Sequence, residues 1–344
     1  MTRIALVSFR LGGTDGVSIE AAKWVQALRR LGHEVHTIAG SGVAGRLIPG
    51  LAADATTPPS RAHLRDALDG YDVVIVENLA SLPLNVAGRE VLYDVLDDRD
   101  AIFRHHDLAW QRAHLAHLDG PRDAPRWRHV TINDLSRREL LARGIVATTI
   151  YNSFDCTPPP GERAATREAL RVTSERLVAL PTRAIPRKNV AGALKLCERL
   201  DATLWIMGPA EDGYGDELAA LIEGASVPVR RLVPAGVTMS DAYAAADLVV
   251  MSSTWEGFGN PVLESVTHRR PLALHPYPVA REIAAFGFDF FDLDDVASIK
   301  EFWRRPDEGL LESNLEVARQ HFNVNDLPAR LEGLLAQSFA SDDD

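Results

Sequence analysis

Apolar residues along the chain fall into short continuous runs that alternate with longer segments in which they recur every three or four positions. The runs at residues 3–9 and 72–76 are typical of strands that are buried on both faces of a sheet. Residues 18–31 place their apolar side chains on one side of a helix. Strands that alternate with amphipathic helices predict a parallel sheet covered by helices.

The same alternation starts again after a proline-rich break in the middle of the chain. The break is Thr157-Pro-Pro-Pro-Gly161, and its composition predicts a linker between two domains. Beyond it, residues 177–181 and 248–251 are predicted strands, and helical periodicity follows each of them. The pattern therefore predicts two doubly wound α/β domains, in which ligands bind at the carboxyl ends of the strands. A cleft between the two sheets is the expected site.

Composition narrows the class of protein. The chain has 344 residues and a net charge of −11, from 37 basic and 48 acidic residues, which argues against nucleic acid as a partner. The spacing between Cys156 and Cys197 does not match that of a metal site. No signal peptide is recognised, and no apolar run approaches the ~18 residues of a transmembrane helix. We expect a cytoplasmic protein with no transmembrane segment, whose acidic end, Ser341-Asp-Asp-Asp344, is a disordered tail.

The segment from Glu256 to Glu264 carries the clearest chemical signal. A short buried apolar run precedes it, and Asn260 followed by Pro261 predicts the N-cap and first position of a helix. Glu256 then lies in a glycine-containing loop, and Glu264 lies about one turn into the helix. Carboxylates accept hydrogen bonds from paired hydroxyls, and a helix start binds anions. The arrangement suits a nucleotide sugar, although an ordinary strand–loop–helix connection with two exposed acids has the same spacing.

The sequence Glu256-Gly-Phe-Gly-Asn-Pro-Val-Leu-Glu264 resembles the E-x7-E element of retaining GT-B glycosyltransferases of the family 4 (group 1) type. The resemblance implies an α/β GT-B fold, with two Rossmann-like doubly wound parallel-sheet domains facing an interdomain cleft. It implies an acceptor-side domain at residues 1–156 and a nucleotide-sugar domain at residues 157–324. Residues 325–344 would form a helix that packs back on the N-terminal domain, followed by the acidic tail.

A pair of basic residues in the second half supports this resemblance. Arg183 and Lys188 lie beside a helix start predicted at Asn189, where two cations favour an anion. They resemble the R-x4-K pair that holds the donor diphosphate, where they stabilise charge that grows on the leaving group. Ordinary surface charge is the alternative, and Arg187 is a weaker candidate. No D-x-D metal motif is recognised, so we expect neither a metal nor another cofactor.

In the first half, His106 follows a predicted strand and resembles the histidine that contacts the transferred sugar. It could donate a hydrogen bond to a sugar oxygen, and a structural histidine is the alternative. His105 and Asp107 beside it also suggest a metal site, but neighbouring side chains on a strand point to opposite faces. Gly13 lies in the glycine-rich loop after the first strand, which in the family approaches donor and acceptor. A turn that needs positive φ explains that loop equally well.

The resemblance assigns the remaining residues as follows. Glu256 would contact the donor sugar, and Glu264 would hold the ribose hydroxyls. The expected catalytic residues are Glu256, His106, Arg183 and Lys188, and the expected donor-binding residues are Gly13, Arg183, Lys188, Gly208, Val237, Phe258, Gly259, Asn260 and Glu264.

The resemblance implies a retaining, metal-independent glycosyltransferase. It would move a hexose from a UDP-, GDP- or ADP-sugar to a hydroxyl of an unidentified small-molecule, glycan or lipid acceptor. Three alternatives stay open at this point: a sugar-nucleotide epimerase, an inverting GT-B transferase, and a nucleotide-sugar-binding protein without turnover. A dinucleotide oxidoreductase is disfavoured, because the first glycine-rich loop lacks the G-x-G-x-x-G spacing.

Overall fold

The computed structural model describes residues 1–337, which fold into two compact units. The first unit comprises residues 1–153 and the chain from Val324 onward, and the second comprises residues 154–323. The predicted acidic tail lies outside the described residues. Each unit is described by itself below.

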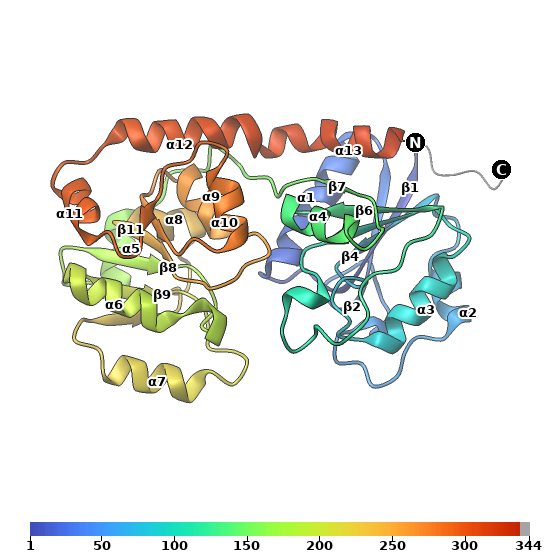
Figure 1. Cartoon of the computed structure of the whole chain (residues 1–344), viewed down its shortest axis with the longest axis horizontal. Helices are drawn as coiled ribbons and strands as arrows, with labels where there is room; N and C mark the ends of the chain where they lie inside the picture. Colours follow the sequence, from blue (N-terminus) through green and yellow to red (C-terminus); the bar gives the residue numbers. More distant parts are fainter. Residues whose placement is uncertain (338–344) are drawn as a thin grey trace. The chain divides into compact units, whose positions relative to one another are not determined.

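The first unit is built on a seven-stranded sheet whose strand order is β3-β2-β1-β4-β5-β6-β7 (Figure 1). All of its pairings are parallel. The strands are β1 (Arg3–Leu11), β2 (Glu34–Gly42), β3 (Arg46–Leu47), β4 (Val73–Glu77), β5 (Ala101–His105), β6 (Trp127–Thr131) and β7 (Ala147–Thr149). Their carboxyl ends therefore meet at one edge of the sheet, where the loops after β4 and β5 place polar side chains.

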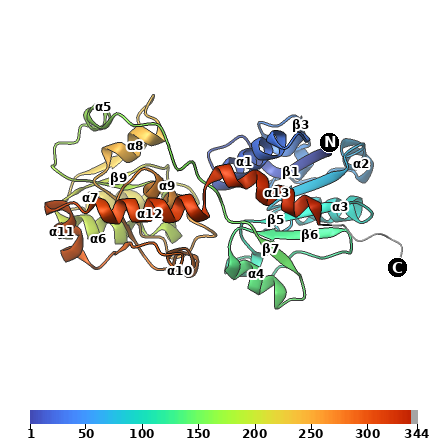
Figure 2. The ribbon, with the colours of Figure 1, turned by 90° about the horizontal axis from the view of Figure 1, so that it is seen from above.

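Helices cover both faces of this sheet, as its buried strands require. They are α1 (Gly16–Arg30), α2 (Arg61–Ala67), α3 (Val86–Leu96), α4 (Asp134–Leu141) and α13 (Leu327–Ala336), with short 3-10 turns at Pro49–Leu51, Ala109–Gln111 and Val324–Asp326. Leu327, Leu331 and Leu334 of α13 are buried in the same apolar cluster as Trp24 and Leu28 of α1. Figure 2 shows these two helices side by side over the sheet. The last helix thus belongs to the core of the first unit.

The second unit contains a six-stranded sheet, ordered β10-β9-β8-β11-β12-β13, and its strands are also parallel. The strands are β8 (Leu177–Leu180), β9 (Thr203–Ile206), β10 (Val229–Arg231), β11 (Leu248–Met251), β12 (Leu272–Leu274) and β13 (Phe291–Asp292). The helices are α5 (Arg163–Ala169), α6 (Val190–Leu200), α7 (Gly215–Glu223), α8 (Met239–Ala245), α9 (Asn260–Thr267), α10 (Pro278–Ala284), α11 (Val296–Arg304) and α12 (Glu308–His321), with a 3-10 turn at Pro186–Lys188.

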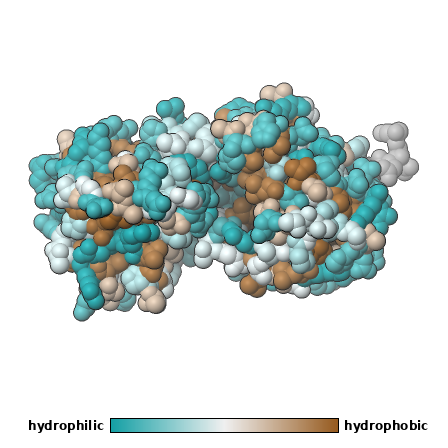
Figure 3. Space-filling view, turned by 90° about the horizontal axis from the view of Figure 1, so that it is seen from below, coloured by the Kyte–Doolittle hydropathy of each residue, from teal (hydrophilic) through white to brown (hydrophobic). Residues whose placement is uncertain are grey.

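The core of the second unit has an apolar cluster on each face of its sheet. Side chains of α6 pack on one face, with Val178, Leu204 and Val250. Side chains of α8 pack on the other face, with Ala179 and Trp205. The face of the protein in Figure 3 shows hydrophobic side chains interspersed with hydrophilic ones on each unit. Two parallel α/β sheets confirm the fold class expected from the sequence.

One helix start differs from the sequence prediction. The N-cap of α9 is Gly259 rather than Asn260. Asparagine and proline have strong preferences for helix starts, but neighbouring contacts decide the final position by one or a few residues.

Candidate functional site

The loop between β11 and α9 is shaped by a glycine that no other residue could replace without strain. Gly259 has φ +87°, and a Cβ there would lie 2.2 Å from the hydroxyl oxygen of Tyr277. That hydroxyl donates to the carbonyl of Phe258 at 3.1 Å, and Tyr277 is buried. The tyrosine therefore fixes the backbone just before α9, and the loop carries Glu256 at a defined position.

Glu256 is buried between two basic side chains. Its Oε1 accepts a hydrogen bond from Nζ of Lys188, and its Oε2 lies 2.7 Å from Nη1 of Arg187. Burial raises the pKa of the Glu256 carboxyl, but the charges of Lys188 and Arg187 outweigh burial and lower this pKa to about 2. Glu256 is therefore ionised at neutral pH, although it is almost inaccessible to solvent.

Lys188 and Arg187 lie in the 3-10 turn that follows β8. Burial lowers the pKa of the Lys188 ammonium, and the Glu256 carboxylate opposes that shift. The backbone carbonyl of Arg187 accepts from the Thr254 amide at 2.9 Å, and that of Lys188 accepts from the Ser252 hydroxyl at 2.8 Å. These bonds fasten the cationic turn to the loop that carries the carboxylate. Two cations facing one carboxylate leave an excess positive charge beside the start of α9.

Arg183 lies at the same end of the sheet but pairs with a different carboxylate. Its Nη1 is 2.6 Å from Oε2 of Glu211, and both side chains are partly exposed. Gly208 packs against the backbone before Arg183, since a Cβ on this glycine would lie 2.5 Å from the carbonyl oxygen of Thr182. Burial is the largest cause of the lowered pKa of Lys188, and the charge of Arg183 contributes to it. The two cations are therefore close enough to interact electrostatically.

Glu264 lies in α9, and its carboxylate is held by a neighbouring helix. Its Oε2 accepts a hydrogen bond of 2.7 Å from the buried hydroxyl of Tyr243 in α8. Its backbone carbonyl accepts from the amide of His268 at 3.1 Å. Glu264 as a whole is partly buried.

The other donor-binding candidates of the second unit lie along the same loops. Phe258 is buried and stacks on Phe154, with 5.9 Å between ring centroids. Asn260 is the first residue of α9. Val237 lies in the turn before α8, and its amide donates to the Pro234 carbonyl at 3.2 Å. The second unit thus brings its candidates to the carboxyl-end loops of one sheet, as expected for a doubly wound fold.

In the first unit, His106 is paired with a carboxylate that the sequence analysis did not single out. Its Nε2 lies 2.7 Å from Oε2 of Glu77, the last residue of β4, and both side chains are buried. Burial raises the pKa of the Glu77 carboxyl, but Arg104 and His106 outweigh it and lower this pKa. A carboxylate only accepts, so Nε2 of His106 carries the hydrogen. The bond to Glu77 uses Nε2, so a contact between His106 and a sugar oxygen would use Nδ1.

Arg104 extends this pair into a buried network. It contacts Glu77 at 3.2 Å and Glu20 at 3.5 Å, and it lies over the ring of Trp24 at 4.3 Å. Lys23 pairs with Glu20 at 2.5 Å. Buried groups in the core of the unit therefore fix Glu77, and Glu77 fixes His106 through the contact with Nε2.

His105 belongs to a separate chain of hydrogen bonds. Its Nδ1 is 2.6 Å from Oγ of Ser81, its Nε2 is 2.8 Å from Nδ1 of His129, and Nε2 of His129 is 3.2 Å from Oδ1 of Asp123. Burial is the largest cause that lowers the pKa of His105 well below its usual value. Neighbouring His105 and His106 thus have different partners. Within residues 1–337, no group of three His, Cys, Asp or Glu side chains is arranged to hold a metal ion.

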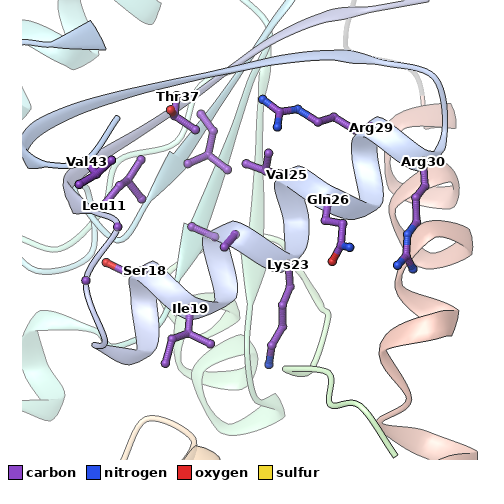
Figure 4. Close-up of a pocket in the computed structure, with 15 residues that line it drawn as sticks. Leu11, Ser18, Ile19, Lys23, Val25, Gln26, Arg29, Arg30, Thr37 and Val43 are labelled. Atoms are coloured by element: carbon purple, nitrogen blue, oxygen red, sulfur yellow. The ribbon is translucent and has the colours of Figure 1, made fainter. Parts of the chain in front are cut away.

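Gly13 lines a pocket of about 890 Å³ beside α1 in the first unit. Figure 4 shows Leu11, Ser18 and Val43 at one end of this pocket, and Arg29 and Arg30 at the other. Asp15 caps α1 next to the pocket by accepting from the Ser18 amide at 3.1 Å. The pocket places the loop after β1 at an open surface that a ligand can reach.

Comparisons with known proteins agree with this architecture. The chain is similar in fold to Anabaena HepE, whose crystal structure contains UDP and glucose; the TM-score is 0.77, with 16% identity over 98% of this chain and 100% of that one. It is similar in sequence to mannosylglucosylglycerate synthase of Thermotoga maritima, with 26% identity over 97% of this chain and 99% of the relative. The same enzyme of Petrotoga mobilis is 26% identical over 86% of this chain and 87% of the relative. Residues 183–297 match the family model described as Glycosyl transferases group 1.

The chain is a glycosyltransferase with the GT-B fold, and its residues 183–297 carry the match to group 1. The matched residues of this glycosyltransferase run from Arg183 through Glu264 to the start of α11. They include the cationic turn after β8 and the loop that carries Glu256. Within residues 1–337, none of the glycosyltransferase's helices is both long enough and apolar enough to cross a bilayer.

Four residues of the candidate site have little or no signal in the sequence. Arg187 is a weaker candidate than Lys188 by its sequence, yet both contact Glu256. Glu77 is the first charged residue after a buried apolar run, which is a usable signal for a position at the carboxyl end of a strand. Glu211 and Tyr243 had no local signal, because each meets its partner only through the packing of the second unit.

Proposed function

We propose that this glycosyltransferase moves a hexose from a nucleotide diphosphate sugar to an acceptor hydroxyl, with retention of the anomeric configuration and without a metal ion. The observation that carries the proposal is the buried Glu256 with Lys188 and Arg187 next to the start of α9. Such a cluster offers excess positive charge and helix N–H groups to a diphosphate. The fold relative crystallised with UDP and glucose supports a nucleotide sugar as donor.

The cationic turn would act on the leaving group. As the bond between sugar and diphosphate breaks, negative charge grows on the diphosphate oxygens. Lys188, Arg187 and Arg183 would stabilise that charge more in the transition state than in the ground state, which raises kcat. Because both Lys188 and Glu256 are buried, their positions need little reorganisation during the reaction. Fixed cations of this kind can take the part that a divalent metal plays elsewhere.

Glu256 would contact the hydroxyls of the transferred sugar, and Glu264 those of the ribose. Both are carboxylates that accept only, and both are oriented by side chains that donate to them. His106 would accept from a sugar hydroxyl through Nδ1 while Glu77 holds its other nitrogen. No side chain is needed as a separate base if the departing phosphate takes the proton of the acceptor. Retention would then follow from attack on the face that the leaving group vacates.

The names of the sequence relatives suggest the first substrates to test. By its name, a mannosylglucosylglycerate synthase makes a glycerate that carries mannosyl and glucosyl groups. Mannose as the hexose, and a small glycerate glycoside as the acceptor, are therefore the first choices for this chain. UDP, GDP and ADP all stay candidates for the nucleotide.

The test is an activity screen of the full chain with UDP-, GDP- and ADP-linked glucose and mannose and with glucosylglycerate as acceptor. Proton NMR of the product gives the anomeric configuration, and we expect that of the donor to be kept. Activity in the presence of EDTA is expected to equal that without it. A product of inverted configuration would refute the retaining mechanism, and loss of activity with EDTA, restored by a divalent cation, would refute metal independence.

A further inference from the structure

The carboxylate of Glu264 in α9 is held by a side chain from α8. Tyr243 of α8 donates its hydroxyl to Oε2 at 2.7 Å, and this tyrosine is 1% exposed. Figure 1 labels α8 and α9, which lie in the same unit. A buried phenol has no solvent to turn toward, so its hydroxyl stays aimed at the carboxylate.

His268, at the end of α9, completes the arrangement around Glu264. Its Nδ1 lies 2.7 Å from the backbone carbonyl of Glu264, so Nδ1 carries a hydrogen, and its Nε2 lies 3.3 Å from Oγ of Ser240. The imidazole stacks on the ring of Tyr243, with centroids 4.6 Å apart and 22° between the planes. Burial is the largest cause of a lowered pKa of His268, which agrees with a neutral ring. The stacked histidine restricts the orientation of the tyrosine ring.

The protonation states in this cluster are consistent with a fixed donor and a fixed acceptor. Burial and the nearby Glu264 charge raise the pKa of the Tyr243 hydroxyl well above its usual value, so the hydroxyl keeps its proton. Glu264 therefore always receives this hydrogen bond on one oxygen. A carboxylate whose orientation is set before binding loses less freedom when a ligand hydroxyl approaches it.

We propose that Tyr243 is a positioning residue that fixes the carboxylate of Glu264 for the ribose hydroxyls of the nucleotide donor. The inference rests on the proposed function, in which Glu264 holds the ribose. It adds that recognition of ribose depends on a residue outside the 256–264 segment, through a side-chain hydrogen bond from α8 to α9. Tyr243 does not touch the donor in this account; it acts through Glu264.

The experiment measures the binding of UDP, GDP and ADP, and of the 2′-deoxy and 3′-deoxy form of whichever binds most tightly, to the full chain by calorimetry. The wild type is expected to bind the ribonucleotide about tenfold more tightly than one of the deoxy forms, as one hydrogen bond to a charged group implies. Tyr243→Phe keeps the ring and its stacking on His268. This variant is expected to lose most of the tenfold preference while its Kd for the deoxynucleotide changes less than about twofold.

Tyr93→Phe is the matched control. Tyr93 is also buried, and its hydroxyl accepts from the Arg122 amide at 3.1 Å in the first unit. Its loss is expected to lower Tm and to leave the preference for ribose unchanged. If Tyr243→Phe weakened ribonucleotide and deoxynucleotide binding by the same factor, Tyr243 would be merely structural and the inference would be wrong.

Glu264→Gln separates this inference from the proposed function. If Glu264→Gln abolishes the ribose preference and Tyr243→Phe keeps it, only the inference about Tyr243 fails. If Glu264→Gln keeps the preference, Glu264 does not hold the ribose, and that part of the proposed function fails together with the inference. Loss of the preference in both variants, with Tyr93→Phe unchanged, supports both.

Discussion

The two units of this glycosyltransferase each bury a carboxylate beside two basic side chains, but their charges balance differently. In the first unit, Glu77 contacts Arg104 at 3.2 Å and His106 at 2.7 Å. In the second unit, Glu256 contacts Arg187 at 2.7 Å and is bonded to Lys188. Glu77 ends a parallel strand and Glu256 lies in the loop after one, and in both cases the surrounding charges outweigh burial and lower the pKa of the carboxyl.

The difference lies in what else surrounds each carboxylate. Arg104 is fully buried and also contacts Glu20, which in turn pairs with Lys23, so the first cluster has as many acids as permanent cations. The second cluster has two cations for one acid, and it lies next to the start of α9. A balanced, closed cluster fastens a fold, whereas an excess of positive charge at a helix start favours an anion. We therefore expect the first cluster to act mainly in stability, and the difference supports the proposal that the second cluster binds the donor.

Arg104→Met should have the largest effect on stability. The change leaves Glu77 and Glu20 buried with less compensation, and breaking a buried ion pair costs about 3–5 kcal/mol. Urea unfolding measures the loss. Arg187→Met is the matched change in the second unit, and it should cost clearly less, because Glu256 keeps Lys188. An equal loss of unfolding free energy in both variants would contradict the proposal that the two clusters have different roles.

Lys188→Ala should have the largest effect on turnover. Removal of one group that stabilises developing charge typically lowers kcat about 10²–10³-fold, and we expect a strong loss for Glu256→Ala as well. Steady-state kinetics with the active donor gives the values, and Tm shows that each variant is folded. Arg199→Ala, which removes the exposed partner of Asp294, serves as the control and should keep wild-type kcat. Near-normal turnover in both site variants would refute the assigned site.

Acidification should destabilise the protein partly through His105. Its pKa is lowered in the fold, so below the ordinary value of 6.5 the unfolded chain binds a proton that the folded chain does not. The free energy of unfolding should therefore fall as pH falls below about 6.5, by up to about 1.4 kcal/mol per pH unit from this group. Urea titrations at several pH values test this. His105→Asn should show a shallower slope, and the exposed His36→Asn should not.

Glu211→Gln should have the smallest effect, and its direction is informative. Glu211 pairs with the half-exposed Arg183 at 2.6 Å, and a donor diphosphate would compete with it for that cation. An exposed pair is worth less than about 1 kcal/mol, so its removal should tighten binding of UDP, GDP or ADP about two- to fivefold. Glu301→Gln, at an exposed pair with Arg304, should change nothing. Weaker binding by Glu211→Gln would mean that Arg183 does not meet the diphosphate.

Much of the fold could be predicted from the sequence, because each buried strand is a local apolar run. The strand at Leu248–Met251 and the cap at Asn189 were both visible as local patterns, and the structure has both. The start of α9 was predicted one residue late, because the position of the cap depends on how Gly259 meets Tyr277.

The candidate site could be predicted only where it is local in sequence. Glu256 and Glu264 are neighbours on one motif, and Lys188 follows a strand end, so their chemistry was visible. Tyr243, at 21 positions from its partner Glu264, has no pattern that links it to the motif. The sequence around His106 gives no sign of its partner Glu77. This residue lies 29 positions away and decides which ring nitrogen of His106 carries the hydrogen.

The most direct test of the central claim is a crystal structure with the nucleoside diphosphate, among UDP, GDP and ADP, that raises Tm most. We predict that its diphosphate lies within hydrogen-bond distance of Lys188 and Arg183, close to the first amides of α9, and that its ribose meets Glu264. A nucleotide bound elsewhere, with these residues unchanged, would contradict the account.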